Sequence, residues 1–161
     1  MTTDATTIAP VRRELTVDAP IERAFDVFVD LPSWWPRETH HLGPTPADAV
    51  MEPFAGGRCF NRADEDGTET DWGRVLEWDP PRRVVFAWMI TPRWACEPDV
   101  AASSEVEVRF TDLGAGRTHV LLEHRGFERY DDGGATMRAT VDGEGGWGYL
   151  MGLFERTVGG A

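Results

Sequence analysis

The N-terminal part of the chain changes its hydrophobic period once. Apolar and polar residues alternate over 11–17, which predicts a strand with one buried face. Apolar residues then recur at three- and four-residue spacing from Ile21 to Phe28, which predicts an amphipathic helix. Pro20 suits the first helical position, and Pro32 ends the helix because a helix rarely continues through a proline.

The middle of the chain is typical of strands joined by tight turns. Ser33 is placed to cap a short second helical turn, and an irregular segment is expected over 37–48. Asp66-Gly67 is a strong hairpin signal. Alternation predicts strands over 49–52, 58–63, 70–78, 84–90, 104–111 and 118–124. A period of two places one set of residues on a common face of the fourth strand, namely Trp72, Arg74, Leu76 and Trp78.

The C-terminal part returns to helical spacing. The apolar positions that carry this pattern are Trp147, Leu150, Met151, Phe154 and Val158. Several glycines weaken the helix, so packing against the rest of the chain must hold it. The pattern predicts an α+β protein with six or seven antiparallel strands, two short helices after the first strand and a long last helix. We expect one domain over 11–159 behind a disordered tail at 1–10.

Four stretches, in this order, resemble a known superfamily. They are 18–25, 54–60, 73–88 and Gly146-Trp147 followed by Leu150 and Leu153. The chain resembles the START/Bet v 1-like (SRPBCC) superfamily, and within it the proteins homologous to the activator of the Hsp90 ATPase. The resemblance implies a helix-grip fold, in which a curved antiparallel sheet wraps around the long C-terminal helix and leaves a cavity. Relatives include lipid and hormone binders, polyketide cyclases and aromatases, and chaperone regulators, so the resemblance implies no single activity.

Charge and composition exclude several classes of partner. The chain has 28 acidic and 16 basic residues, all arginine, and a net charge of −12. Such a surface repels phosphate backbones and anionic headgroups, so we expect no nucleic-acid and no membrane partner. No apolar run reaches the roughly 18 residues of a membrane span, and residues 1–10 lack a signal-peptide pattern. A cytoplasmic protein with two reduced thiols, Cys59 and Cys96, is expected.

Tryptophan is abundant, with seven residues among 161. Aromatic walls with few polar groups are typical of small-molecule pockets, although each tryptophan could instead fill the core. The expected partner is a small apolar or aromatic ligand. The residues predicted to line its pocket are Trp35, Trp72, Arg74, Phe86, Trp88, Phe110, His124, Trp147 and Met151.

Ionisable candidates for chemistry are few. His124 follows inward-facing positions of the last strand, so it could act as a general base, hold a polar group of a ligand, or be a core histidine with one hydrogen bond. Arg74 could lie inside the pocket or stay wet at its mouth. His40-His41 matches no zinc motif, and solvated loop histidines are the default. The sequence therefore predicts no metal, no cofactor and no assigned catalytic residue.

Three functions remain open. The first is a non-catalytic binding domain for a hydrophobic ligand, of the type related to the Hsp90 ATPase activator. The second is a polyketide cyclase or aromatase that uses His124 or Arg74. The third is a chaperone or protein-interaction module with a filled core and an exposed apolar patch. Trp94 could belong to that patch or to a homodimer contact.

Overall fold

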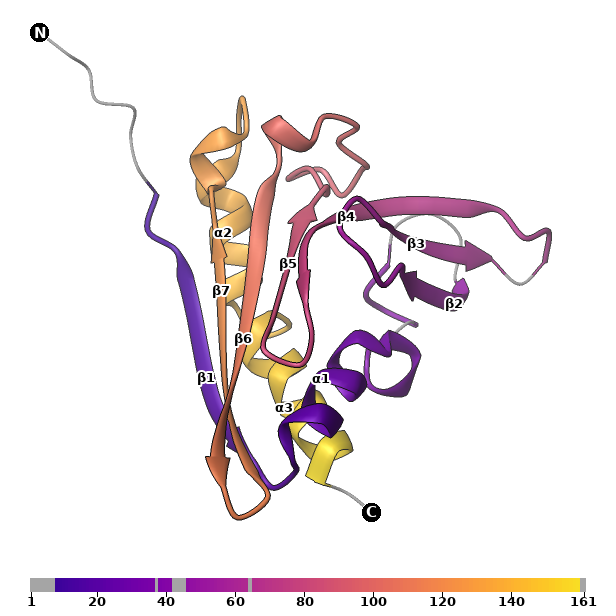
Figure 1. Ribbon diagram of the computed structural model, residues 1–161. Coiled ribbons are helices and arrows are strands. Elements are labelled where there is room, and N and C mark those ends of the chain that lie inside the picture. The colour runs from indigo at the N-terminus through magenta and orange to yellow at the C-terminus, as the bar shows by residue number, and fades with distance from the viewer. Residues whose placement is uncertain (1–7, 37, 42–45, 64, 160–161) are drawn as a thin grey trace, which may run out of the picture.

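The fold is built on one antiparallel sheet. The computed structural model describes residues 8–36, 38–41, 46–63 and 65–159 (Figure 1). Seven strands lie in the order β1-β7-β6-β5-β4-β3-β2, so neighbours in sequence pair and β1 closes against the last strand. The strands are β1 (Val11–Val17), β2 (Pro46–Met51), β3 (Arg58–Ala63), β4 (Glu69–Asp79), β5 (Arg83–Trp88), β6 (Ser104–Gly114) and β7 (Arg117–Arg125). The predicted antiparallel sheet is confirmed.

The helices gather on one face of this sheet (Figure 1). They are α1 (Ile21–Val29), α2 (Gly134–Asp142) and α3 (Trp147–Gly159), with 3-10 turns η1 (Leu31–Ser33), η2 (Val100–Ala102) and η3 (Phe127–Arg129). The helix-grip fold is confirmed, since the sheet curves around α3, and α1 and η1 are the two short helices after β1. Helix α2 was not predicted. Residues 1–7 of the predicted tail, and 37 and 42–45 of the predicted irregular segment, lie outside the described residues.

Aromatic contacts join α1 to the sheet and to α3. The apolar stripe of α1 is buried, and its Phe28 ring lies 5.9 Å from that of Phe110 in β6 and 5.4 Å from that of Phe154 in α3. Phe25 adds an edge contact with Phe110 at 5.3 Å between ring centroids. Edge-to-face pairs of this kind are favourable beyond the burial of their area. The region in which α1 packs against β6 and α3 is therefore part of the hydrophobic core.

Two β-bulges in β4 decide which of its side chains face the helices. The pairing with β3 skips Trp72 and the pairing with β5 skips Leu76, so each is an extra residue that resets the alternation. Arg74 lies between the bulges opposite Ala87, which alternates with the inward-facing residues of β5. Arg74 therefore faces the outer side of the sheet. The prediction of one common face was wrong for this set, namely Trp72, Arg74, Leu76 and Trp78.

The outer face of the sheet carries a network of ion pairs. Glu107, with a side chain only 8% exposed, contacts Arg83, Arg109 and Arg125 at 2.5–2.6 Å. Burial alone would raise the pKa of Glu107, but hydrogen bonds from these three guanidinium groups outweigh it and lower the pKa to about 2. The network pairs charges across β5, β6 and β7, on the side of the sheet away from the helices.

Candidate functional site

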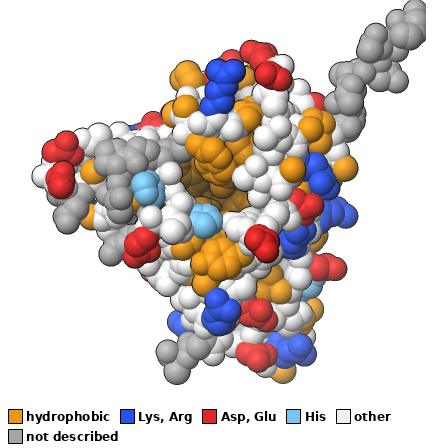
Figure 2. Space-filling view, turned by 180° about the vertical axis from the view of Figure 1, so that it is seen from behind, with side chains coloured by type: hydrophobic (Ala, Val, Ile, Leu, Met, Phe, Trp, Pro, Cys, Tyr) orange, Lys and Arg blue, Asp and Glu red, His pale blue; other side chains and the backbone are white. Residues whose placement is uncertain are grey.

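A cavity of about 450 Å³ lies between the sheet and the junction of α2 with α3. In Figure 2 it is a hollow floored by hydrophobic side chains, with histidine at its rim. This volume is typical of sites for small organic molecules. Five tryptophans line it, namely Trp35, Trp72, Trp88, Trp94 and Trp147. We call it the tryptophan-lined cavity.

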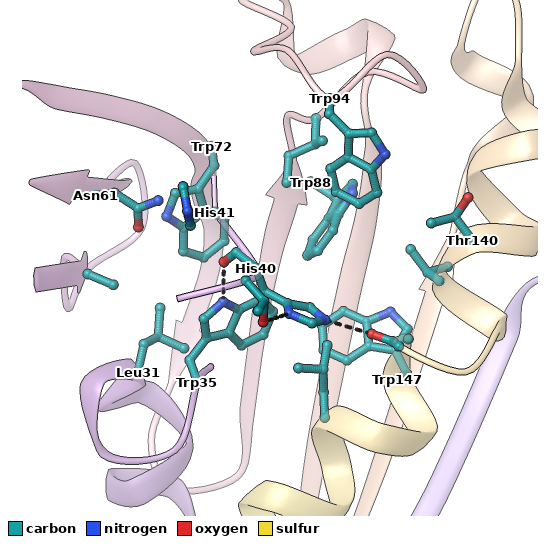
Figure 3. Close-up of a pocket in the computed structure, with 17 residues that line it drawn as sticks. Leu31, Trp35, His40, His41, Asn61, Trp72, Trp88, Trp94, Thr140 and Trp147 are labelled. Atoms are coloured by element: carbon teal, nitrogen blue, oxygen red, sulfur yellow. Dashed lines mark hydrogen bonds between the residues drawn. The ribbon is translucent and has the colours of Figure 1, made fainter. Parts of the chain in front are cut away.

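Different elements supply these indoles (Figure 3). Trp35 follows η1, Trp72 is the first bulge residue of β4, and their ring planes are nearly parallel at 10° with centroids 6.5 Å apart. Trp88 ends β5 and Trp147 begins α3, and these two rings meet edge to face at 5.6 Å. Simple alternation would place Trp72 and Arg74 on the same face of β4. The bulge breaks the alternation, so that Trp72 faces the cavity while Arg74 faces away from it.

The nine residues predicted for the pocket separate into three groups. Those that line the cavity are Trp35, Trp72, Trp88 and Trp147. Those that pack in the core without lining it are Phe86, Phe110 and Met151. Phe86 lies behind the wall, with its ring 6.0 Å from that of Trp72. Arg74 and His124 do not line it either: Arg74 is on the outer face, and His124 is fully buried.

His124 is the centre of a buried chain of hydrogen bonds. Trp147 Nε1 donates to His124 Nδ1 at 2.9 Å, and His124 Nε2 lies 2.8 Å from Ser104 Oγ. Ser104 Oγ lies 2.9 Å from the hydroxyl of Tyr130, which donates to the carbonyl of Ile90 at 2.8 Å. The chain begins at the Trp147 N–H, which can only donate, and ends at the Ile90 carbonyl, which can only accept. The direction of each hydrogen bond between them is therefore fixed. His124 carries its proton on Nε2 and donates it to Ser104.

This chain leaves His124 no role as a base. Burial lowers its pKa to about 3, so the ring is neutral at physiological pH, and both ring nitrogens are occupied. It has two hydrogen-bonded partners where the sequence suggested one. His124 therefore acts as a positioning residue that fixes the indole of Trp147 in the cavity wall.

His40 lies at the rim of the cavity, which the sequence did not predict. Its Nε2 lies 2.9 Å from the carbonyl oxygen of Gly145, and its Nδ1 lies 2.7 Å from Thr39 Oγ1 (Figure 3). Because the carbonyl can only accept, Nε2 carries the proton and Nδ1 accepts from the Thr39 hydroxyl. Trp35 Nε1 donates to the His40 carbonyl at 2.7 Å and holds the segment in place. A hydroxyl, an imidazole and an orienting carbonyl thus stand in line at the cavity.

Other lining residues were also missed from the sequence. Asn61 of β3 and Thr140 of α2 contribute polar groups, and His41 joins His40 at the rim. Trp94 is half exposed and has a positive φ of 59°, which is unusual for a bulky residue. Trp94 lines the cavity, so its partial exposure has an explanation other than the predicted apolar patch. A homodimer remains a prediction.

Two further features bear on the class of site. Within the described ranges, no group of three or more His, Cys, Asp or Glu side chains is arranged to hold a metal ion. None of the helices in the described part of the chain is long and apolar enough to cross a membrane.

Two proteins of matching length are among the solved structures that this chain resembles. An anthrahydroquino-gamma-pyrone synthase, Txn09, is 38% identical with a TM-score of 0.63, over 94% of this chain and 97% of that one. CalC from Micromonospora echinospora, described as a self-sacrificing resistance protein, is 26% identical with a TM-score of 0.66, over 92% and 93%.

A third structure supports the fold alone. The di-domain ARO/CYC protein BexL is 18% identical with a TM-score of 0.62, and the match covers 94% of this chain but 46% of that one. No curated protein matches. The family described as activator of Hsp90 ATPase homolog 1-like protein matches residues 18–159. The chain therefore belongs to this family.

Proposed function

We propose that this protein binds a flat, largely apolar aromatic molecule of the polyketide type in the tryptophan-lined cavity. The observation that carries the proposal is the set of five indoles around a space of about 450 Å³. Indole faces favour stacked and edge contacts with flat rings, and a cavity with few polar groups favours a ligand that is mostly hydrocarbon. The similar synthase supports this class, since its name describes a fused-ring pyrone product.

The cavity also weighs against an interaction module. Such a module was expected to have a filled core and a contiguous apolar patch. The large apolar side chains that are exposed within the described ranges come from four separate segments, and they are Phe54, Trp94, Leu113 and Tyr149. Two of them belong to the cavity, since Trp94 lines it and the Tyr149 ring lies 5.9 Å from that of His40 at its rim. Single exposed apolar side chains such as the other two are normal for a folded protein. The proposal therefore favours a small molecule over a protein partner.

Calorimetric titration with flat and flexible probes tests the proposal. We expect xanthone or 1,8-dihydroxyanthraquinone to bind with a Kd in the micromolar range, which corresponds to a binding free energy of about −8 kcal/mol. Palmitate should bind far more weakly. Ala49→Trp fills the cavity that Ala49 lines and abolishes binding, whereas Leu113→Trp introduces the same indole at an exposed strand position and leaves binding intact. Circular dichroism checks that both variants fold. Wild type that binds no flat probe, or prefers palmitate, contradicts the proposal.

A second candidate function is ring closure on the bound molecule, because Thr39 and His40 line the cavity and are hydrogen-bonded to each other, as a proton relay requires. In closure of a pyrone ring, a phenolic hydroxyl adds to a carbonyl carbon. Its proton passes through Thr39 Oγ1 to His40 Nδ1 and on to the former carbonyl oxygen. That oxygen then leaves as water with a proton from the neighbouring carbon, so one C–O bond forms and one water is lost. The Gly145 carbonyl stabilises the protonated imidazole between the two transfers.

Replacing Thr39 by valine separates binding from this chemistry. With a 2-hydroxyaryl 1,3-diketone as substrate, we expect kcat for pyrone formation to fall about 100-fold and KM to change little, because general acid–base groups contribute about 10²–10⁴. Thr140→Val is the matched control, since the Thr140 hydroxyl already donates to the Thr136 carbonyl. Absorbance of the product follows the rate. Equal losses in both variants, or a wild-type rate no faster than the uncatalysed one, would rule out the relay.

A further inference from the structure

Two polar groups in the cavity wall have no hydrogen-bond partner among the residues that the structure describes. Trp88 is 4% exposed and lines the cavity, yet its Nε1 is buried without a hydrogen-bond partner among the described residues. Asn61 is 6% exposed and lines the same cavity, and its side-chain amide likewise bonds to none of the residues that the structure describes. Figure 3 shows both side chains directed into the space between the indoles. Buried polar groups are nearly always paired, so the Trp88 N–H needs an explanation, whereas the Asn61 amide is not among the fully covered atoms and can meet a molecule in the cavity.

Two of the other cavity tryptophans donate their indole N–H within the protein. Trp35 Nε1 donates to the His40 carbonyl at 2.7 Å, and Trp147 Nε1 donates to His124 Nδ1 at 2.9 Å. Trp34, in the core beside them, donates to the Phe28 carbonyl at 3.0 Å. The fold thus provides acceptors for indoles with a structural role. Among the described residues, Trp88 differs from these in that its N–H is buried in the cavity wall without an acceptor.

We propose that the Trp88 N–H and the Asn61 amide bind oxygen atoms of the ligand, so that the protein selects an oxygenated ring system, a quinone or pyrone, over a hydrocarbon of the same shape. This inference rests on the proposed function and deepens it. An indole N–H only donates, so its partner is an acceptor such as a ring carbonyl. Asn61 both donates and accepts, so it also suits a phenolic hydroxyl.

The charge of the site narrows the acceptor to a neutral oxygen. No arginine is among the described residues that line the cavity, and the chain as a whole carries a net charge of −12. A carboxylate or phosphate would enter this environment without a cation to compensate its desolvation. Arg74 also has a buried, unpaired Nε, but it lies on the other side of the sheet and does not reach the cavity. A carbonyl or phenol remains the fitting class.

Xanthone and xanthene form a matched pair of probes, because both are flat tricycles and only xanthone has the ring carbonyl. We expect wild type to bind xanthone about tenfold more tightly than xanthene, as one hydrogen bond to an otherwise unpaired buried donor would give. Trp88→Phe keeps an aromatic ring but lacks the N–H. In this variant we expect the preference to fall below about twofold, with xanthene weakened only as much as loss of ring size weakens it in Trp35→Phe.

Trp35→Phe is the control for loss of ring size, because the Trp35 N–H is already used within the protein. It should weaken xanthone and xanthene to the same extent and keep the tenfold preference. Asn61→Leu, of similar volume, is the second variant if Trp88→Phe does not fold, and it should weaken xanthone selectively. Wild type that binds both probes equally overturns this inference and leaves the proposed function standing. Wild type that binds neither probe contradicts the proposed function itself.

Discussion

Replacing His124 by leucine is expected to lower the free energy of unfolding by about 3–5 kcal/mol. The two side chains are similar in size, so the loss comes from the hydrogen-bond chain and not from an empty space. Trp147 Nε1 loses its acceptor and Ser104 Oγ loses its donor, both inside the core. Each buried polar group left unpaired costs about 1–3 kcal/mol. Urea denaturation followed by circular dichroism measures the difference.

The control is a histidine on the surface. The His119 side chain pairs with the exposed carboxylate of Glu14 at 3.0 Å, so His119→Gln is expected to change stability by less than about 0.5 kcal/mol. If the free energy of unfolding of His124→Leu lies within 1 kcal/mol of the wild-type value, the buried hydrogen bonds of His124 do not stabilise the core as described.

The same residue predicts a pH dependence of stability. Native His124 has its pKa lowered to about 3 by burial, whereas in the unfolded chain it has the ordinary value of about 6.5. The unfolded state therefore takes up a proton that the native state excludes. Stability from neutral His124 is complete above about pH 6.5 and is lost as the pH falls from there toward 3, by up to about 1.4 kcal/mol per unit.

Between about pH 6.5 and 5 this effect is separable from the carboxylates, which in the unfolded chain titrate near 4. Over this interval we expect the free energy of unfolding of wild type to fall more steeply than that of His124→Leu. Parallel slopes for the two proteins would mean that His124 is protonated in the native state.

Replacing Gly146 by alanine is expected to cost about 3 kcal/mol or more and to disturb the cavity. A Cβ at this position would lie 1.9 Å from the carbonyl oxygen of Val141 and 2.4 Å from its carbonyl carbon. Both atoms belong to the backbone, so no side-chain rotation relieves the clash, and α3 must move away from α2. Large values of this kind arise from overpacking at a site that cannot adjust. Thermal denaturation and probe binding together report the two effects.

Gly152→Ala is the matched control within α3. An added Cβ there meets no atom within 4 Å, and alanine is the better helix former. We expect this variant to be more stable than wild type by about 0.5–1 kcal/mol, with unchanged probe binding. A Gly146→Ala variant that matches wild type in both measurements would show that the α2–α3 junction is free to open.

The sequence alone determined the main elements of this protein. The helix α1, most of the strands and the helix α3 were predicted because their apolar residues repeat at 3.6 or 2 over long enough stretches. Helix α2 was missed because few of its residues are buried, with Met137 and Val141 as its large apolar contacts. The family resemblance was equally a property of the sequence, since it depends on the order of local motifs.

Only the tertiary structure decided the chemistry of the cavity. Period two assigned Arg74 to the face of Trp72, but a bulge is fixed by the pairing of two strands and one strand's sequence does not reveal it. His40 meets the Gly145 carbonyl across 105 residues, and no local pattern records a contact of that range. The role of His124 likewise depends on Ser104 of β6 and Trp147 of α3, which strand pairing and the packing of α3 on the sheet bring to it. Local periodicity specifies which face of an element is apolar, whereas hydrogen-bond partners are set by the packing of elements far apart in the chain.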